Sequence, residues 1–210
     1  MVALGIGEII DAALGEESKT HHLRKRLEGK LPLLQQKLLL PEEAPAFALM
    51  AFITGYVRSV PSCLRLVTAV SKQFGFFNYA APFLHLAEVS FLQPRGELLQ
   101  AGGLAAVLDE AFLAHRLLEE VNDHHIKHLQ HPLLPLDMTE ANIIVHHLLG
   151  DEFATLLEEL VQFTASGLLH REHVWEQARA LGASQDPLTP LVPVEPLIDS
   201  AWQIRLRLAS

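Results

Sequence analysis

The sequence predicts an all-α fold, a single-domain helical bundle of about six to eight helices with buried central helices. Apolar residues recur at spacings of three and four over long segments, whereas runs that alternate with period two are few. Half of the 210 residues are hydrophobic, which excludes general disorder, and only 12 are glycine. We therefore expect a helical bundle domain over residues 1–182, followed by a Pro-rich C-terminal strap and terminal segment over residues 183–210.

Two helical patterns open the chain. Residues 2–14 place isoleucine, alanine and leucine side chains on one side, which predicts a short amphipathic helix. Residues 18–40 continue the helical pattern and carry a cluster of lysines and arginines. Gly29 and Pro32 interrupt this second pattern, so one helix and two shorter pieces both fit it.

The next part of the chain holds two strongly apolar segments, residues 44–57 and 77–92, which are expected in the core together with the two long segments described below. Residues 44–57 are apolar nearly all round, which is typical of a buried helix. Pro61 is predicted to end that helix, because an interior proline removes a backbone hydrogen bond, and residues 62–74 are predicted to form another helix. Residues 77–92 follow as the most apolar segment of the chain and are predicted to form a core helix.

Two long helical segments, residues 104–129 and residues 141–163, follow with a short Pro-containing loop between them. Residues 104–164 hold seven of the 12 histidines and 11 acidic residues against two basic ones. Drawn as one uninterrupted helix, the second segment has an apolar arc that we predict faces the core. Its members are Val145, Leu148, Leu149, Phe153, Leu156, Leu160 and Phe163.

The C-terminal quarter is less regular. Residues 168–180 predict a short helix, and the four prolines of residues 184–196 indicate an extended strap. Residues 201–208 alternate apolar side chains with arginine, a pattern that fits either a short strand or a last helix.

Charge and cysteine content limit the setting in which the protein acts. The net charge of −9 argues against nucleic acid as the main partner. The single cysteine, Cys63, excludes an internal disulfide framework and fits a reducing cytoplasm, and its apolar neighbours favour an inert core side chain. Residues 1–15 lack a basic n-region, and the apolar runs are shorter than the roughly 20 residues of a membrane span. We therefore expect a soluble, cytoplasmic protein that does not bind membranes.

The common catalytic motifs are not found in the sequence. There is no Walker A loop, no glycine-rich dinucleotide fingerprint, no Gly-x-Ser-x-Gly elbow, no His-Glu-x-x-His and no Cys-x-x-Cys. Hydrolases and kinases of those kinds are not indicated.

Polar residues recur on the predicted core side of the long helices, and they supply the candidate site. An ionised carboxylate buried without a partner is costly, so inward acidic residues normally have a cation, a metal or a hydrogen-bonded partner. The inward set comprises Arg58, His85, Glu88, His115, Glu119, Asn122, Asn142, His146, Glu152 and Glu159. We predict that five of them bind a transition metal, iron or manganese, because mixed imidazole and carboxylate ligands suit those ions. These five candidate metal ligands are His85, Glu88, His115, Glu119 and Glu152.

This combination of helices and ligand types resembles the ferritin-like di-iron carboxylate proteins over residues 42–165. That family uses Glu-x-x-His on two helices, whereas this chain has His85-Leu86-Ala87-Glu88 in reversed order and His115 four residues before Glu119. The resemblance implies a helical-bundle protein with a buried metal site, with redox or oxygenase-like chemistry on a small substrate.

A second hypothesis from another class fits the same residues. The inward polar groups can satisfy one another as a structural network, in which case the chain is a non-enzymatic helical interaction or ligand-binding protein. Its partner would be a small molecule, a protein docking on the basic N-terminal helix or the Pro-rich tail, or a second copy in a homodimer. Whether the chain is an enzyme is left open by the sequence. The basic residues 19–37 are also expected to complement the acidic pair of long helices, within one chain or across a dimer.

Overall fold

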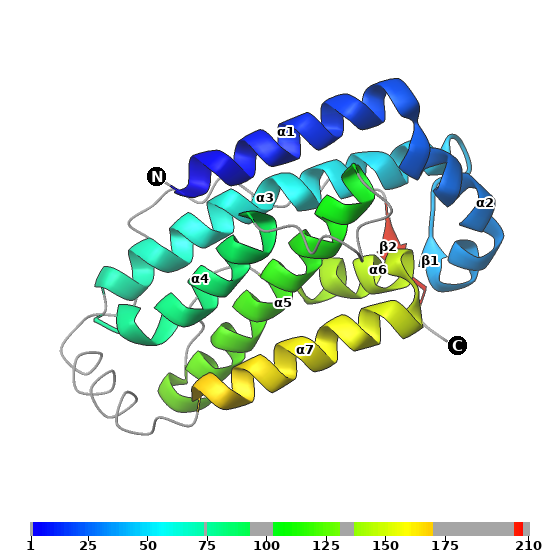
Figure 1. The fold of residues 1–210 in the computed structure, drawn as a ribbon. Coiled ribbons are helices and arrows are strands. Elements are labelled where there is room, and N and C mark those ends of the chain that lie inside the picture. The colour runs from blue at the N-terminus through cyan, green and yellow to red at the C-terminus, as the bar shows by residue number, and fades with distance from the viewer. Residues whose placement is uncertain (1, 74, 93–102, 131–136, 170–203, 208–210) are drawn as a thin grey trace.

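The computed structural model describes residues 2–73, 75–92, 103–130, 137–169 and 204–207. These residues form seven α-helices and one two-stranded antiparallel sheet, which confirms the predicted all-α fold (Figure 1). The elements are α1 (Val2–Thr20), α2 (His22–Lys37), β1 (Leu38–Leu39), α3 (Pro45–Gln73), α4 (Phe77–Leu92), α5 (Leu104–Leu129), α6 (Thr139–Leu149), α7 (Asp151–Leu169) and β2 (Arg205–Leu206).

Helix α5 is the centre of the bundle. It packs against α1, α3, α4, α6 and α7, and its middle turns are buried on every side. Its apolar residues Leu108, Phe112 and Val121 are all buried there. Figure 1 shows α1 and α7 along opposite outer sides of the molecule, with α3, α4 and α5 between them. The face of α7 turned away from α5 therefore lies on the outside of the bundle.

The first two helices meet at a sharp turn. His21 adopts the left-handed backbone conformation with φ of 52°, so α1 ends there and α2 begins at the next residue. The buried Glu17 carboxylate accepts hydrogen bonds from the backbone N–H groups of Leu23 (3.0 Å) and Arg24 (3.1 Å). An acidic side chain at these otherwise unpaired groups stabilises the helix start.

Prolines do not end the helices as the sequence predicted. Pro61 lies inside α3, which is continuous from residue 45 to residue 73, and Pro32 lies inside a continuous α2. The prediction of a break at Pro61 was therefore wrong. The carbonyl of Tyr56, one turn before Pro61, accepts hydrogen bonds from the Ser59 hydroxyl (2.8 Å) and the His115 ring (3.2 Å). These bonds tie the stretch before Pro61 to α5, whereas the ladder bond that the proline removes is the one to the carbonyl of Val57, four residues before it.

A break does occur where none was predicted. Gly150 has φ of 103° and ends α6, and Asp151 starts α7, so residues 141–163 are two helices and not one. Glycine reaches this region without the steric penalty of a side chain. The turn changes which face of the following helix meets the core. Leu157 is 8% exposed and Val161 is 1% exposed, whereas the predicted core residue Leu156 is 59% exposed.

The end of the described chain forms a strand. Leu38 pairs with Leu206, and the N–H of Arg207 donates to the carbonyl of Lys37 at 2.8 Å. This contact selects the strand from the two alternatives that the pattern of residues 201–208 left open. Residues 170–203, which include most of the predicted short helix and the Pro-rich strap, lie outside the described residues.

Within the described ranges, α3 alone has the length and hydropathy of a membrane-crossing helix. Core helices of globular proteins reach the same values, and 56% of its apolar window is buried inside the molecule. This helix is therefore weak evidence for a membrane span.

Candidate functional site

A chain of polar side chains crosses the bundle, starting in its centre at Tyr56 of α3. The Tyr56 hydroxyl is fully buried and donates to Oδ1 of Asn142 in α6 at 2.7 Å. The Asn142 amide, 2% exposed, donates in turn to Oε2 of Glu119 in α5 at 2.7 Å. Burial, together with the negative charge of Glu119, raises the pKa of Tyr56 well above its ordinary value. Tyr56 is therefore a neutral hydrogen-bond donor.

The second part of this polar chain of contacts is an ion-pair cluster between α5 and α7. Glu119 accepts hydrogen bonds from Arg116, one turn earlier in the same helix, and from the Thr139 hydroxyl at 3.1 Å. Nε of Arg116 lies 3.7 Å from Oε1 of Glu158 in α7. The Arg116 and Glu119 side chains are 22% and 14% exposed. Because the guanidinium has a carboxylate on either side, its charge is compensated in a mostly dry position.

The third part of the polar chain of contacts leads from the ion-pair cluster to the surface of the molecule. Nδ1 of His146 lies 3.3 Å from Glu158, and Nε2 of the same ring lies 3.6 Å from Asp151 at the start of α7. Asp151 accepts hydrogen bonds from Nζ of Lys37, the last residue of α2, at 2.6 and 2.8 Å. Hydrogen bonds from Lys37 and His147 lower the pKa of the Asp151 carboxyl. The chain of contacts therefore joins α2, α3, α5, α6 and α7, and Lys37 links the basic segment to the acidic helices within one molecule.

His115 forms a separate buried contact beside Tyr56. Its Nε2 lies 3.0 Å from Oγ of Ser59 and 3.2 Å from the carbonyl oxygen of Tyr56. Because Ser59 donates its own hydrogen to that carbonyl, the ring is the donor and Nε2 carries the proton. Burial lowers the pKa of His115 to about 4, so the ring is neutral near pH 7. His115 is thus placed as a hydrogen-bond donor to the backbone of α3.

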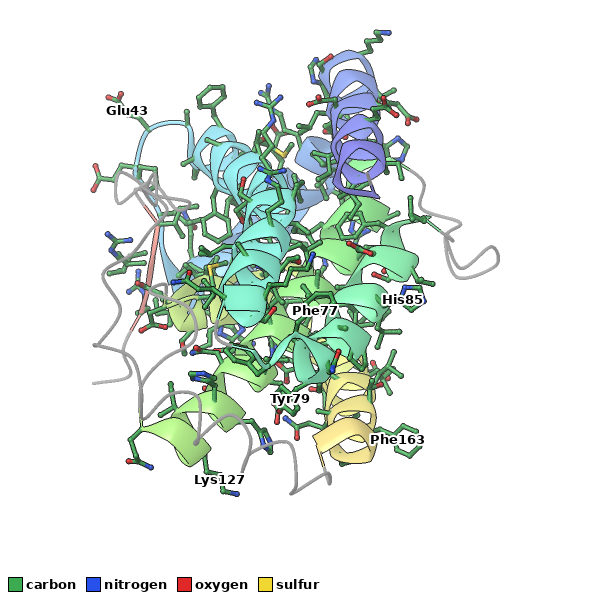
Figure 2. All side chains as sticks on the ribbon, turned by 90° about the vertical axis from the view of Figure 1, so that its left-hand side faces the viewer. Glu43, Phe77, Tyr79, His85, Lys127 and Phe163 are labelled. Atoms are coloured by element: carbon green, nitrogen blue, oxygen red, sulfur yellow. The ribbon has the colours of Figure 1, made fainter. Side chains whose placement is uncertain are left out.

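The five predicted metal ligands do not meet at one point. His85 of α4 and Glu152 of α7 are exposed, Glu88 and Glu119 are partly buried, and His115 is buried. Figure 2 shows His85 on the outer side of the molecule. No group of three or more His, Cys, Asp or Glu side chains among the described residues is placed to hold a metal ion.

The two ligands nearest the centre are already engaged. Both oxygens of Glu119 accept hydrogen bonds, and Nε2 of His115 contacts Ser59 and the backbone. The residues therefore do not fit an iron or manganese site in the described part of the chain, and the metal hypothesis stays a prediction. Glu152 faces outward because the turn at Gly150 changes the phase of α7.

Arg58, the predicted inward cation, was placed wrongly. It is exposed and lies 3.3 Å from Asp11 of α1. Arg116, which is not in the set of residues predicted to point inward, is the cation at the centre of the cluster. Its spacing of three from Glu119 was the available signal, since residues three apart are neighbours on a helix. Glu158 and Lys37 gave no such signal, because their partners are distant in sequence.

The outer face of α7 carries an apolar stripe that the sequence had placed in the core. Its members and their exposed fractions are Phe153 39%, Leu156 59%, Leu160 37% and Phe163 80%. Figure 2 shows the Phe163 ring projecting away from the bundle. Exposed Glu152 and Glu159 line one edge of the stripe. A shallow groove follows the other edge, lined by Leu86, Ser90, Leu113, Leu117, Leu160, Val161 and Thr164.

No protein-family model matches this chain, and neither does any curated protein or solved structure. The likeness to ferritin-like proteins stays a prediction. The apolar stripe and the polar chain of contacts are thus the features from which a function can be inferred.

Proposed function

We propose that the protein is a non-enzymatic helical interaction protein that binds a partner helix through the apolar stripe of α7, defined by Phe153, Leu156, Leu160 and Phe163. The observation that carries this proposal is the exposure of these four side chains along one face of one helix. Scattered exposed apolar residues are ordinary, whereas a contiguous row on a helix is the pattern of a helix-docking face.

The two faces of α7 divide the work between folding and binding. Ala154, Leu157, Val161 and Ala165 are buried against the bundle and hold the helix in place. The stripe residues lie at spacings of three, four and three, the repeat with which one helix packs along another. A partner helix with apolar residues at the same spacing therefore fits this face.

The polar chain of contacts fixes the orientation of the stripe. Glu158 and Asp151 tie α7 to Arg116 of α5, to His146 of α6 and to Lys37 of α2. Rotation of α7 about its axis would break these contacts and separate the partly buried Glu158 carboxylate from Arg116 and His146. This role accounts for Arg116, His146 and Glu158 without a bound ligand.

The charges of α7 favour a protein partner over a lipid surface. The helix carries four acidic residues, Asp151, Glu152, Glu158 and Glu159, and no lysine or arginine. Helices that lie on anionic membranes carry basic residues on the polar side, and acidic ones are repelled. We therefore assign the stripe to another helix.

A photo-crosslinking amino acid tests this function in the cells that express the protein. Placed at position 163 it should give an adduct that disappears when Leu156→Asp is added, because the charge disrupts the docking face. The matched control is the same probe at Phe47 of α3, a phenylalanine of similar exposure at 69%. Adducts that are equal at both positions, or that survive Leu156→Asp, would contradict the proposal.

A metal titration tests the competing hypothesis. The melting temperature should not change on addition of Fe(II), Mn(II) or Zn(II), since Glu119 and His115 are already engaged by protein donors. A rise that Glu119→Gln abolishes would instead favour the buried metal site.

A further inference from the structure

We propose that the partner helix is α7 of a second copy of this chain, packed antiparallel across a two-fold axis that passes near residue 158. This inference rests on the proposed binding role of the apolar stripe and names its occupant.

The order of residues in the stripe is the first argument. Phe-x2-Leu-x3-Leu-x2-Phe reads the same in both directions, from Phe153 to Phe163. A two-fold interface is self-complementary: if residue i contacts residue j of the partner, then j contacts i. With the axis at residue 158, Phe153 lies opposite the partner's Phe163, and Leu156 lies opposite the partner's Leu160. Each layer of the interface then pairs two residues of the same type.

The spacing is the second argument. Intervals of three, four and three place Phe153 and Leu160 at one core position of a heptad and Leu156 and Phe163 at the other. Two such helices pack side by side with a small crossing angle. Because Figure 1 shows α7 along the outer side of the bundle, the second copy can approach without displacing another helix.

The size of the surface predicts the strength of the contact. With about 200 Å² for a large apolar side chain, the four exposed fractions correspond to roughly 400 Å² of apolar surface per chain. A pair of chains would bury about 800 Å² through the stripes, below the roughly 1,200 Å² of the smallest standard interfaces. We therefore expect a weak, reversible dimer, since the contact is smaller than the interfaces of stable complexes.

The acidic edge gives the dimer a signature that separates it from other partners. In the antiparallel arrangement, the flanking position Glu159 lies next to the partner's Glu159, beside the axis. Like charges there oppose association, so removing the charge or adding salt should tighten the dimer. The affinity for a basic partner would instead fall when the Glu159 charge is removed or salt is added. A head-to-tail contact with the exposed basic residues of α2 in another copy would also weaken with salt, and it would produce open chains.

Sedimentation of the purified full chain over micromolar to submillimolar concentrations tests the proposal. The wild type should show a monomer–dimer equilibrium, and Leu156→Asp should raise the dissociation constant at least about tenfold, because both copies carry the change. The matched control is Leu33→Asp on α2, at 66% exposure, which should leave the constant unchanged. Both leucines are exposed, so both variants keep the fold, as unchanged circular dichroism would show.

The charge variant supplies an independent readout. Glu159→Gln should tighten the dimer a few-fold, whereas Glu43→Gln, at another exposed glutamate, should not change it. A chain that stays monomeric throughout, equal effects of the two leucine variants, or weaker association of Glu159→Gln would each overturn the two-fold dimer. If the chain is monomeric and the adduct at position 163 still depends on Leu156, the binding function stands with a different partner. If that adduct is also lost, the binding function fails as well.

Discussion

Two neighbouring leucines of α7 give a direct test of how this helix is oriented. Leu157 is 8% exposed and packs into the hydrophobic core, whereas Leu156 is 59% exposed. The same substitution to alanine should therefore have different consequences at the two positions. Leu157→Ala removes buried methyl groups and leaves a cavity, a change that costs about 2 to 5 kcal/mol of unfolding free energy. Because Leu157 lies at the edge of the core, we expect about 3 kcal/mol.

Leu156→Ala should change the unfolding free energy by less than about 0.5 kcal/mol, since its side chain is mostly in water already. Urea denaturation followed by circular dichroism measures both values, at a protein concentration below the expected dimer dissociation constant. The dependence of the free energy on urea should be the same for all three proteins, which shows that only stability has changed. Equal losses, or a larger loss at Leu156, would mean that α7 continues the phase of α6 and that the apolar stripe belongs to the core.

Three further predictions concern the buried polar groups, each measured by urea denaturation. Glu119→Gln should destabilise the protein by about 2 to 3 kcal/mol, because Arg116 loses its closest counter-charge in a mostly buried position; a loss under about 0.5 kcal/mol would contradict the structural role of the pair. Burial lowers the pKa of His115 to about 4, so between pH 6.5 and 4 the unfolded chain binds the extra proton, and up to about 3 kcal/mol of unfolding free energy is lost as the pH falls. This loss should be absent in His115→Gln. The same dependence of unfolding free energy on pH in the variant and the wild type would refute the prediction. Burial raises the pKa of Asp109 to about 7, so the folded chain holds the extra proton above pH 3.8, and at most about 4 kcal/mol is lost as the pH rises to 7. Asp109→Asn should therefore be more stable than the wild type at pH 8 and similar at pH 4, and the reverse order would contradict a partly buried, neutral carboxyl.

The fold was predictable because its helices are long and their apolar residues repeat. The segment 104–129 was predicted with the bounds that α5 has, since a period near 3.6 over seven turns admits no other regular structure. The errors came from single residues. Pro61 was interpreted as a helix end, but α3 continues through it, and the tertiary contact beside it comes from His115 of α5, which the local sequence does not show.

Gly150 had the larger effect on the interpretation of the site. A glycine inside a helical pattern is often tolerated, so the sequence did not signal that this one adopts φ of 103°. The missed turn rotated the predicted arc, placed Glu152 inside and placed Leu156 in the core. A helical wheel gives directions only within one unbroken helix, and every inference beyond the break shared the error.

The polar contacts were only partly predictable. Asn142 and Glu119 were identified as inward groups, and both are in the network. Tyr56 donates to Asn142 across 86 residues of sequence, and no periodicity relates the two positions. Arg58 was misplaced because the predicted helix ended just after it; α3 continues to Gln73, and Arg58, Arg65 and Lys72 recur every seven residues on its exposed face.

Crosslinking of a cysteine placed beside the proposed axis tests the two-fold dimer most directly. In Glu159→Cys, a short bis-maleimide should join two copies through the same residue, because residue 159 lies next to its own symmetry mate. The native Cys63 should not react, since it is 1% exposed and burial raises the pKa of its thiol to about 12. Glu43→Cys is the matched control at an exposed glutamate away from α7. The account predicts a covalent dimer from Glu159→Cys that Leu156→Asp suppresses and no dimer from Glu43→Cys; equal crosslinking at the two sites, or none at residue 159, would contradict it.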